Sequence, residues 1–409
     1  MSDTDTAPAP RALGPLRSPP FRLLMTAQTV NAFGQGITPV ALAFAVLDLG
    51  GSATQLGLVV AAYALAEVVT VLFGGVLGDR LPRTVMLQGS NSASAGLQAV
   101  VAASLIGGWS SVGLLAALGL VGGCLSSLGQ PSSRAITQQT VTPEQLPSAV
   151  SLRRISANTA VAGGFAVAGV LVAAFGSGWA IAIDAATFAF ASLCFSRLRV
   201  PPLPAPVRER ILADLRSGAA EVFRHAWLWV LIVQALVYHL FYGGAQGVLG
   251  PIVVKRVYGE PAWGWALGAL MVGFIVGGLT TLRFRPRRGL YAGTALLAFT
   301  ALFPLALALH PALGLLLLGA FAHGFGLEIF SVNWDLAIQQ HVDPAKLSRV
   351  YSFDIVGSFV ARPLGLALTG LVAETVGFSD WLLVIAAVMF VSTLVALAVP
   401  DVRRIERLP

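Results

Sequence analysis

The chain has 409 residues, of which 56% are hydrophobic and only 11% are charged. A soluble domain carries about 25% charged residues, so a chain this apolar could not cover its surface with polar groups in water. The composition therefore excludes a soluble globular protein and favours one immersed in lipid. The net charge of +7 is then a matter of membrane topology, and no nucleic-acid partner is expected.

Residues 1–20 are rich in Ala and Pro and predict a disordered tail. They lack the short apolar core and small-residue cleavage site of a signal peptide. Hydrophobic segments follow along the whole chain, and a helix needs roughly 20 apolar residues to cross the hydrocarbon core. About twelve segments meet this requirement, at residues 21–47, 54–78, 84–106, 111–138, 148–174, 179–196, 226–250, 262–282, 290–309, 312–338, 348–375 and 380–400.

Charge placement supports this arrangement independently. An even number of spans puts both termini on one side of the membrane. All 26 Lys and Arg residues then lie in the termini and loops of that side or in the ends of the spans next to it, except Lys255, Arg256 and Arg362. The positive-inside rule makes this side cytoplasmic. We therefore expect a multi-pass protein of the cell (inner or plasma) membrane with both termini in the cytoplasm.

An internal repeat divides the chain into two halves. The segment "QQTVTPEQLPSAVSL" at 138–152 matches "QQHVDPAKLSRVYSF" at 339–353, so the loop after span four resembles the loop after span ten. Parallel halves related by an axis along the membrane normal are typical of one large class of secondary transporters. The predicted parts are a cytoplasmic tail 1–20, a six-helix bundle 21–196, a cytoplasmic linker 197–225, a second six-helix bundle 226–400 and a cytoplasmic tail 401–409.

The linker begins with a Pro-rich stretch that ends span six. From Val207 onwards its apolar and charged residues alternate with a helical period, which predicts an amphipathic helix lying on the membrane surface. A simple tether between the halves is the function that we expect for it.

Two glycines followed by arginines interrupt the apolar pattern twice, as "GGVLGDRLPR" at 74–83 and "GGLTTLRFRPRR" at 277–288. The first motif, the repeat and the linker resemble the major facilitator superfamily. Its signature between helices two and three is Gly, three residues, Asp-Arg, one residue, Gly and two basic residues. The matching residues are Gly75, Asp79, Arg80 and Arg83, with Pro82 at the position of the second Gly and Thr84 at that of the last basic residue.

The segments "AIAIDAATFAFASL" and "ARPLGLALTGLVAETVG" resemble the branch that contains enterobactin exporters and macrolide efflux proteins. The resemblance covers residues 20–405 and implies an all-α integral membrane fold of about twelve transmembrane helices in two parallel-repeat bundles. It also implies that Asp79 latches the cytoplasmic side shut, with Arg134 as a plausible partner. The alternative for this motif is a positively charged membrane anchor only.

Ionisable residues inside the spans are expensive to insert and are functional by default. Glu67, Glu328 and Arg362 lie near the middle of spans two, ten and eleven. A buried carboxylate can exchange a proton as a cleft alternates between faces, so Glu67 and Glu328 are the proton-coupling candidates. The alternatives are that each is a structural group, or that Arg362 simply neutralises Glu328. Asp184 is interpreted as structural, because helix six of the superfamily usually lies outside the edge of the cleft.

The superfamily builds its cleft from helices one, four, seven and ten. In span one, three amides recur at i, i+3 and i+7 and share one face. Spans seven and ten combine aromatic rings with amides, a mixture that suits a large amphipathic ligand. Ordinary packing is the alternative for the aromatic residues. The cleft candidates are Gln28, Asn31, Gln35, Gln234, Tyr238, Tyr242, Asn333 and Trp334.

The sequence thus predicts a monomeric, proton-coupled antiporter that exports amphipathic small molecules, such as drugs, antibiotics or a siderophore, by alternating access. An uptake permease of the same fold for a small organic solute is the alternative. We expect no enzymatic activity and no cofactor, because no phosphate-binding Gly-x-x-x-x-Gly-Lys motif is present. No metal is expected either, because the five histidines form no pair with metal-binding spacing.

Overall fold

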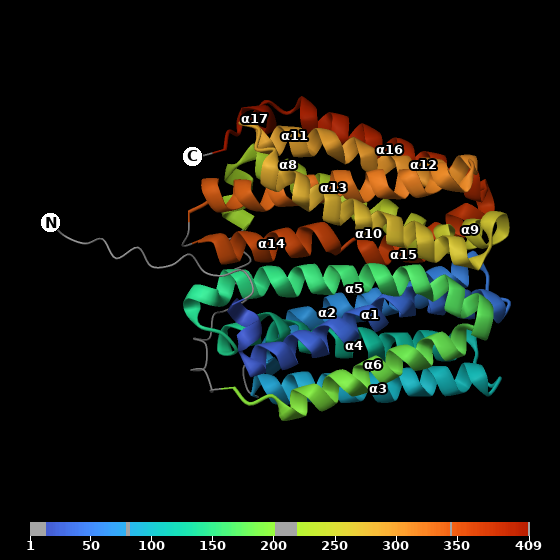
Figure 1. The fold of residues 1–409 in the computed structure, drawn as a ribbon. Coiled ribbons are helices and arrows are strands. Elements are labelled where there is room, and N and C mark those ends of the chain that lie inside the picture. The colour runs from blue at the N-terminus through green and yellow to red at the C-terminus, as the bar shows by residue number, and fades with distance from the viewer. Residues whose placement is uncertain (1–13, 79–81, 201–218, 344–345, 408–409) are drawn as a thin grey trace.

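The computed structural model describes residues 14–78, 82–200, 219–343 and 346–407. The helices of this part of the chain run side by side in two layers, with α1 to α6 in one layer and α8 to α17 in the other (Figure 1). This is the all-α, two-bundle architecture that the composition and the repeat predicted. Of the sequence-based divisions, residues 1–13 of the tail and 201–218 of the linker lie outside the described residues.

The first bundle is built from long helices with local capping signals. Ser18 precedes α1 and its hydroxyl accepts the Phe21 N–H at 3.4 Å, while Ser111 caps α4 by accepting the Leu114 N–H at 3.2 Å. Such caps satisfy backbone donors that have no partner within the helix. The helices are α1 (Pro19–Asp48), α2 (Ala53–Gly78), α3 (Arg83–Ile106), α4 (Val112–Ala135), α5 (Leu146–Phe175) and α6 (Ser177–Arg197).

The second bundle repeats this arrangement with more interruptions. Span seven, expected to end at 250, continues to Tyr258 through a π-helical turn, η4, next to Pro251, which has no N–H to donate to the helix. The elements are α8 (Ala226–Gly244), η4 (Ala245–Leu249), α9 (Gly250–Tyr258), α10 (Glu260–Arg283), α11 (Gly289–Leu296), η5 (Leu297–Ala301), α12 (Leu302–Leu309), α13 (Leu313–His341), α14 (Leu347–Phe359), α15 (Arg362–Val376), α16 (Phe378–Ala398) and α17 (Pro400–Arg404).

Eleven helical stretches of the described chain are long and apolar enough to cross a membrane. Helix α3 is the additional predicted span. It has 24 residues, which is long enough, but its Gln, Asn and Ser side chains lower its mean hydropathy. Several of these side chains face other helices, as when Ser92 Oγ lies 2.6 Å from Ser192 Oγ of α6. Part of the polarity of α3 is therefore used in hydrogen bonds to neighbouring helices of the bundle.

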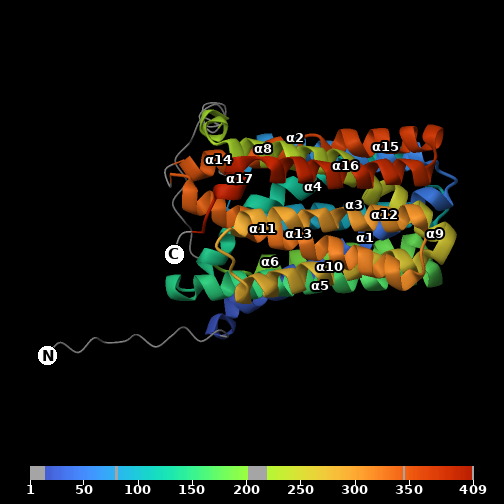
Figure 2. The same cartoon turned by 90° about the horizontal axis from the view of Figure 1, so that it is seen from above.

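The two layers meet along two close contacts between helices. Helix α2 packs against α15, and α5 packs against α10 (Figures 1 and 2). At both contacts a glycine faces backbone: a Cβ on Gly57 would overlap the Leu366 carbonyl, and one on Gly264 would overlap the Phe165 carbonyl. Small residues let membrane helices approach this closely. These contacts join the halves firmly at one end of the molecule.

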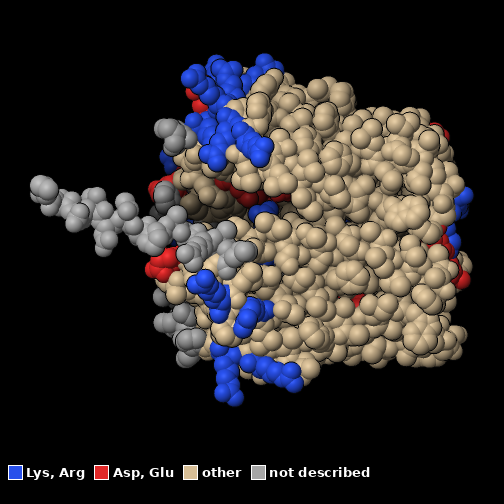
Figure 3. All heavy atoms as spheres, in the orientation of Figure 1, with Lys and Arg blue, Asp and Glu red and all other residues tan. Residues whose placement is uncertain are grey.

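Charged residues gather at the ends of the helices. The start of α1 and helix α17 lie at the same end of the bundle (Figure 1). Lys and Arg side chains cluster at that end, and on the face shown the region between the ends is almost free of charge (Figure 3). Large apolar side chains such as Leu65, Leu193 and Leu279 are exposed on the helices. This surface is the one that a protein spanning a bilayer needs.

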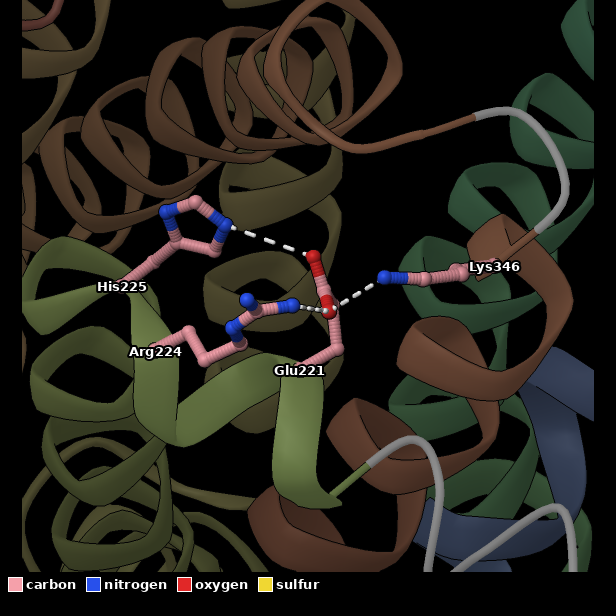
Figure 4. A network of polar contacts seen from close by, with 4 residues as sticks. All are labelled: Glu221, Arg224, His225 and Lys346. Atoms are coloured by element: carbon pink, nitrogen blue, oxygen red, sulfur yellow. Dashed lines mark hydrogen bonds and ion pairs between the residues drawn. The ribbon is translucent and has the colours of Figure 1, made fainter.

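The end of the linker is attached to the second bundle through Glu221. Residues 219–224 are helical, and the helix predicted from Val207 otherwise lies outside the described residues. The Glu221 carboxylate accepts a hydrogen bond from Lys346 Nζ at 2.8 Å and lies 3.4 Å from Arg224 and 3.6 Å from His225 (Figure 4). Lys346 precedes α14, so the linker is fixed to the loop between α13 and α14.

Candidate transport cavity

A cavity of about 950 Å³ lies at the centre of the molecule. Figure 3 shows a hollow between the two layers, at the end where Lys and Arg gather, with acidic side chains inside it. Ligand pockets commonly measure about 300–1,000 Å³, so the cavity can hold a drug-sized molecule. Its lining comes mainly from α1 to α6. The second bundle contributes Gly243, Gln246, Gly247, Pro251, Trp263, Leu267, Arg362 and Leu366.

The wall formed by the first bundle is rich in hydrogen-bonding groups. Gln28 of α1 donates to Ser133 Oγ of α4 at 2.9 Å, and Asn31 donates to Asn91 Oδ1 of α3 at 3.1 Å. Asn31 Oδ1 is buried and has no hydrogen-bond partner among the described residues. Further amides and hydroxyls line the same wall: Gln35, Thr38, Ser90, Ser94, Gln98, Ser126 and Asn158.

The cleft candidates separate into two groups. Those of α1, namely Gln28, Asn31 and Gln35, line the cavity. Those of the second bundle lie away from it and are buried among its own helices: Gln234, Tyr238, Tyr242, Asn333 and Trp334. Helix α8 reaches the cavity instead through Gly243 and the π turn after it, where Gln246 lies. A role in substrate binding stays a prediction for both groups.

The tyrosines of α8 pack around a buried histidine. Tyr238 Oη lies 2.7 Å from His323 Nε2, and His323 Nδ1 lies 2.8 Å from the Thr300 carbonyl. A carbonyl only accepts, so Nδ1 of a neutral His323 carries the proton and Nε2 accepts from Tyr238. The Tyr242 ring stacks on His323 with centroids 4.2 Å apart. These contacts tie α8 to α13 inside the bundle.

Asn333 and Trp334 make similar internal contacts. Asn333 donates to the Ile329 carbonyl of its own helix at 2.8 Å. Trp334 donates to Asp354 Oδ2 of α14 at 3.2 Å and packs edge-on against Trp227. Buried polar groups need hydrogen-bond partners. For Asn333 and Trp334, these partners belong to the second bundle itself.

Glu67 and Arg362 both line the cavity, and they come from different bundles. Glu67 belongs to α2. Arg362 is the first residue of α15, just after the short break that separates α14 from α15. Tyr63 of α2 lines the same cavity. The cavity therefore has an acid on one wall and a cation on the other.

Glu328 pairs with a residue that sequence reasoning missed. Its carboxylate lies 3.9 Å from Arg154 of α5, and the two side chains are 17% and 65% exposed. This ion pair joins the two bundles, and because the Arg154 side chain is largely exposed to solvent, the pair is worth at most about 1 kcal/mol. The signal in the sequence was a pair of arginines, Arg153 and Arg154, inside an otherwise apolar span. Arg362 has no ion pair with Glu328 in the described structure.

The motif between spans two and three is only partly described. Gly75 lies in α2 and Arg83 is the first residue of α3. Asp79 and Arg80 lie outside the described residues, as does the side chain of Arg134 in α4. The latch at this position stays a prediction.

The opposite end of the molecule is closed by polar contacts between the bundles. Lys255 Nζ of α9 lies 2.5 Å from Asp48 of α1 and 2.7 Å from Glu260 of α10. The Glu374 carboxylate of α15 accepts the Thr54 backbone N–H at 3.0 Å and its hydroxyl at 2.7 Å. Thr54 lies in the first turn of α2, where backbone donors lack partners and an acid is favoured by the helix dipole.

Two helical bundles around a cavity that is open at one end and closed at the other define a transporter of the major facilitator type. The chain belongs to the transmembrane secretion effector family, whose model matches residues 10–314. The chain is also similar, along nearly its whole length, to efflux proteins and to solved transporters of this fold.

Among these, the multidrug efflux pump Tap of Mycolicibacterium fortuitum is 28% identical over 415 residues, which cover 95% of this chain and 98% of the pump. Macrolide efflux protein A of Streptococcus pyogenes is 23% identical, with 94% and 97% covered. A mutant of the nucleoside transporter NupG has a TM-score of 0.77 at 14% identity, covering 93% of this chain and 99% of that one. The last likeness concerns the fold alone.

Proposed function

We propose that this protein is a proton-coupled antiporter that exports amphipathic small molecules across the plasma membrane. The observation that carries the proposal is the cavity between the bundles, together with the position of its opening. The cavity opens at the end where Lys and Arg gather (Figure 3). By the positive-inside rule this end faces the cytoplasm, so both termini are cytoplasmic and the structure corresponds to a state that loads substrate from inside.

Export, rather than uptake, is supported by relatives that match the chain along nearly its whole length. Two of them are named as efflux proteins, one for multiple drugs and one for macrolides. The composition of the cavity fits such cargo. One wall offers amides and hydroxyls, and the other offers apolar surface from Trp263, Leu267 and Leu366. A ligand with a polar and an apolar side uses both walls.

Proton coupling is supported by the acidic lining. Glu67 faces the cavity from the first bundle and Arg362 faces it from the second. In the proposed cycle, a proton taken up from outside neutralises the acid and favours return to the inward-open state. Substrate binding then favours release of the proton. Small molecules and protons are thus the partners of a transporter that acts as a monomer.

An efflux panel tests this proposal. Cells that produce the protein should accumulate less of a lipophilic cation, a macrolide or a catecholate siderophore than cells that do not. Collapse of the pH gradient by a protonophore should abolish the difference. Higher accumulation in the producing cells would overturn export and indicate an uptake permease, and an effect that survives the protonophore would overturn proton coupling.

A further inference from the structure

The cavity contains a second carboxylate, Asp184 of α6, that the sequence led us to interpret as structural. Asp184 is only 1% exposed to solvent, yet it lines the cavity. It lies about two turns from the start of α6, at the closed end of the molecule. A buried acid inside a membrane protein is expensive to retain, so its surroundings indicate what it does.

The Asp184 carboxylate is held by neutral groups from three helices. Thr38 of α1 lies 2.5 Å from Oδ2, and Gln98 of α3 donates to the same oxygen at 2.8 Å. Thr187 of α6 lies 3.2 Å from Oδ1. No Lys, Arg or His forms an ion pair with Asp184 in the described structure. When the Asp184 carboxylate is ionised, its negative charge is stabilised only by the dipoles of these hydroxyl and amide groups.

Helix α1 covers this carboxylate closely. A Cβ on Gly34 would overlap both Asp184 Oδ1 and Thr187 Oγ1, so the backbone of α1 passes directly over the acid. Oδ1 thus lies against α1, and Oδ2 is held by Thr38 and Gln98. This enclosure leaves more room for a proton than for an organic cation at the carboxylate.

The hydrogen bonds around Asp184 permit either protonation state. The ionised carboxylate accepts from all three neighbours. When Oδ2 carries a proton, it donates to Thr38 Oγ1, because a hydroxyl both donates and accepts and can rotate. Gln98 Nε2 lies 3.2 Å from Thr38 Oγ1 as well, so the amide keeps an acceptor in both states. Protonation therefore reverses the hydrogen bond between Thr38 and Asp184, because the Thr38 hydroxyl gives up its own donation to Oδ2, and it changes the links between α1, α3 and α6.

Few other charges act on this site. The elements packed against α6 are α1, α3 and α5. From α1 and α3, the groups that face Asp184 are Thr38 and Gln98. The arginines of α5, Arg153 and Arg154, lie near the start of that helix, at the end of the molecule opposite to Asp184. The titratable groups that α2 contributes to the same cavity are Tyr63 and Glu67. A change of charge at Asp184 is consequently felt mainly by the helices that hold it.

We infer that Asp184 is a proton-binding site of the transport cycle, in which binding of the proton alters the packing of α1 and α3 against α6. The inference rests on the proposed proton-coupled export, to which it adds a coupling residue. The proton comes from water and returns to water, and no other bond is formed or broken.

Infrared spectroscopy of the full-length protein in lipid vesicles, without substrate, tests proton binding itself. On acidification the parent should show a carboxylic-acid C=O band that is missing from Asp184→Asn. The band should remain in Glu67→Gln and in Asp380→Asn, which removes an exposed acid at the start of α16. An identical band in Asp184→Asn, or no band that titrates, would overturn the inference.

A second set of variants covers the case in which Asp184→Asn fails to fold. Thr38→Val and Gln98→Leu each remove one neutral donor and keep the acid. Each should shift the pH midpoint of the band, whereas Asp380→Asn should leave it in place. Midpoints that stay the same in both donor variants would contradict the assignment.

Transport assays separate this inference from the proposed function. Asp184→Asn vesicles should exchange substrate down its gradient but lose at least tenfold in efflux driven by a pH gradient, which corresponds to about 1.4 kcal/mol. Retained gradient-driven efflux would remove Asp184 from coupling while leaving export intact. If the band is lost but even the parent shows no export, the proton site stands and the proposed function fails.

Discussion

Glu67 and Arg362 place opposite charges on the two bundles, facing one cavity. Replacement of Glu67 by Gln keeps the size of the side chain and its hydrogen-bonding ability but removes its titration. We expect Glu67→Gln to abolish efflux driven by a pH gradient and to retain substrate exchange in its absence. Inverted vesicles with an imposed gradient give the measurement. Asp380→Asn is the control, and unchanged coupling in Glu67→Gln would exclude Glu67 from the mechanism.

Helical periodicity located some cavity residues and not others. Gln28, Asn31 and Gln35 share a face of α1, and that face lines the cavity. Tyr238 and Tyr242 share a face of α8 with equal regularity, but it packs against His323. A period shows that residues lie on one side of a helix. It does not show whether that side meets water or another helix, because this depends on residues far away in the chain.

The sequence also did not show which residues the ionisable side chains contact. For Glu328, a proton-coupling candidate, the alternative was neutralisation by Arg362, and the structure places its carboxylate 3.9 Å from Arg154 instead. Asp184 was assigned a structural role because α6 was expected outside the cleft, yet it lines the cavity beneath α1. In both cases the sequence located an acid inside a span correctly. The neighbour that decides its role comes from another helix.

At the scale of elements, the spans could be predicted well because length and apolarity alone decide whether a helix crosses a bilayer. The predicted end of α3, at 106, agrees with the structure, as does the predicted start of α2 to within one residue. The π turn after Gly244 could not be predicted in the same way. It depends on Pro251 together with the packing of Gly250 against the Trp263 ring, which brings Gln246 to the cavity.

The linker is an element whose attachment depends on pH. The hydrogen bond from Lys346, aided by Arg224, holds the pKa of the Glu221 carboxyl below its usual range. A lowered pKa in the attached state means that the stabilisation is present above the pKa of a free glutamate and is lost as the pH falls through the lowered value. The attachment should therefore weaken only in acid.

Hydrogen exchange of residues 219–225, corrected for intrinsic rates, measures this attachment. The parent should show slow exchange at neutral pH and faster exchange in acid. Glu221→Gln should exchange fast at both, because its neutral amide cannot pair with Lys346. Glu144→Gln removes an exposed acid from η3 (Pro143–Gln145) at the same end and serves as the control. Equal exchange in Glu221→Gln and the parent would show that the ion cluster does not hold the linker.

At the scale of the whole molecule, the closed end is held by a few polar links. Glu374 binds the first turn of α2 from the opposite bundle. We expect Glu374→Ala to shift the population toward opening at this end by about fivefold, since an exposed charged link contributes about 1 kcal/mol. Distances between spin labels at Gln55 and Thr375 would report the shift. Asp380→Ala, at the same end, should not change them, and equal distributions in Glu374→Ala would refute this link.

Close backbone contact between the bundles is a second property of the whole molecule. A Cβ on Gly370 of α15 would overlap the Ala53 carbonyl of α2. Gly370→Ala should therefore destabilise the observed state by about 1–3 kcal/mol, although alanine favours a helix more than glycine does. Gly96→Ala in α3, where a Cβ meets open space, is the matched control. Thermal unfolding in lipid would measure both, and a Gly370→Ala protein as stable as the control would contradict the expected overlap.

The glycines between the halves have a mechanical consequence. Gly57 and Gly370 lie on one contact, and Gly169 and Gly264 lie on the other, each facing bare backbone across the boundary. These glycines have no side chain that could interlock with the opposite bundle. A rotation of one half against the other about the two contacts therefore requires no side chain to be withdrawn from the neighbouring helix. In the proposed transport cycle, we therefore expect the charged contacts at the closed end, rather than side-chain packing between the halves, to limit the rate at which that end opens.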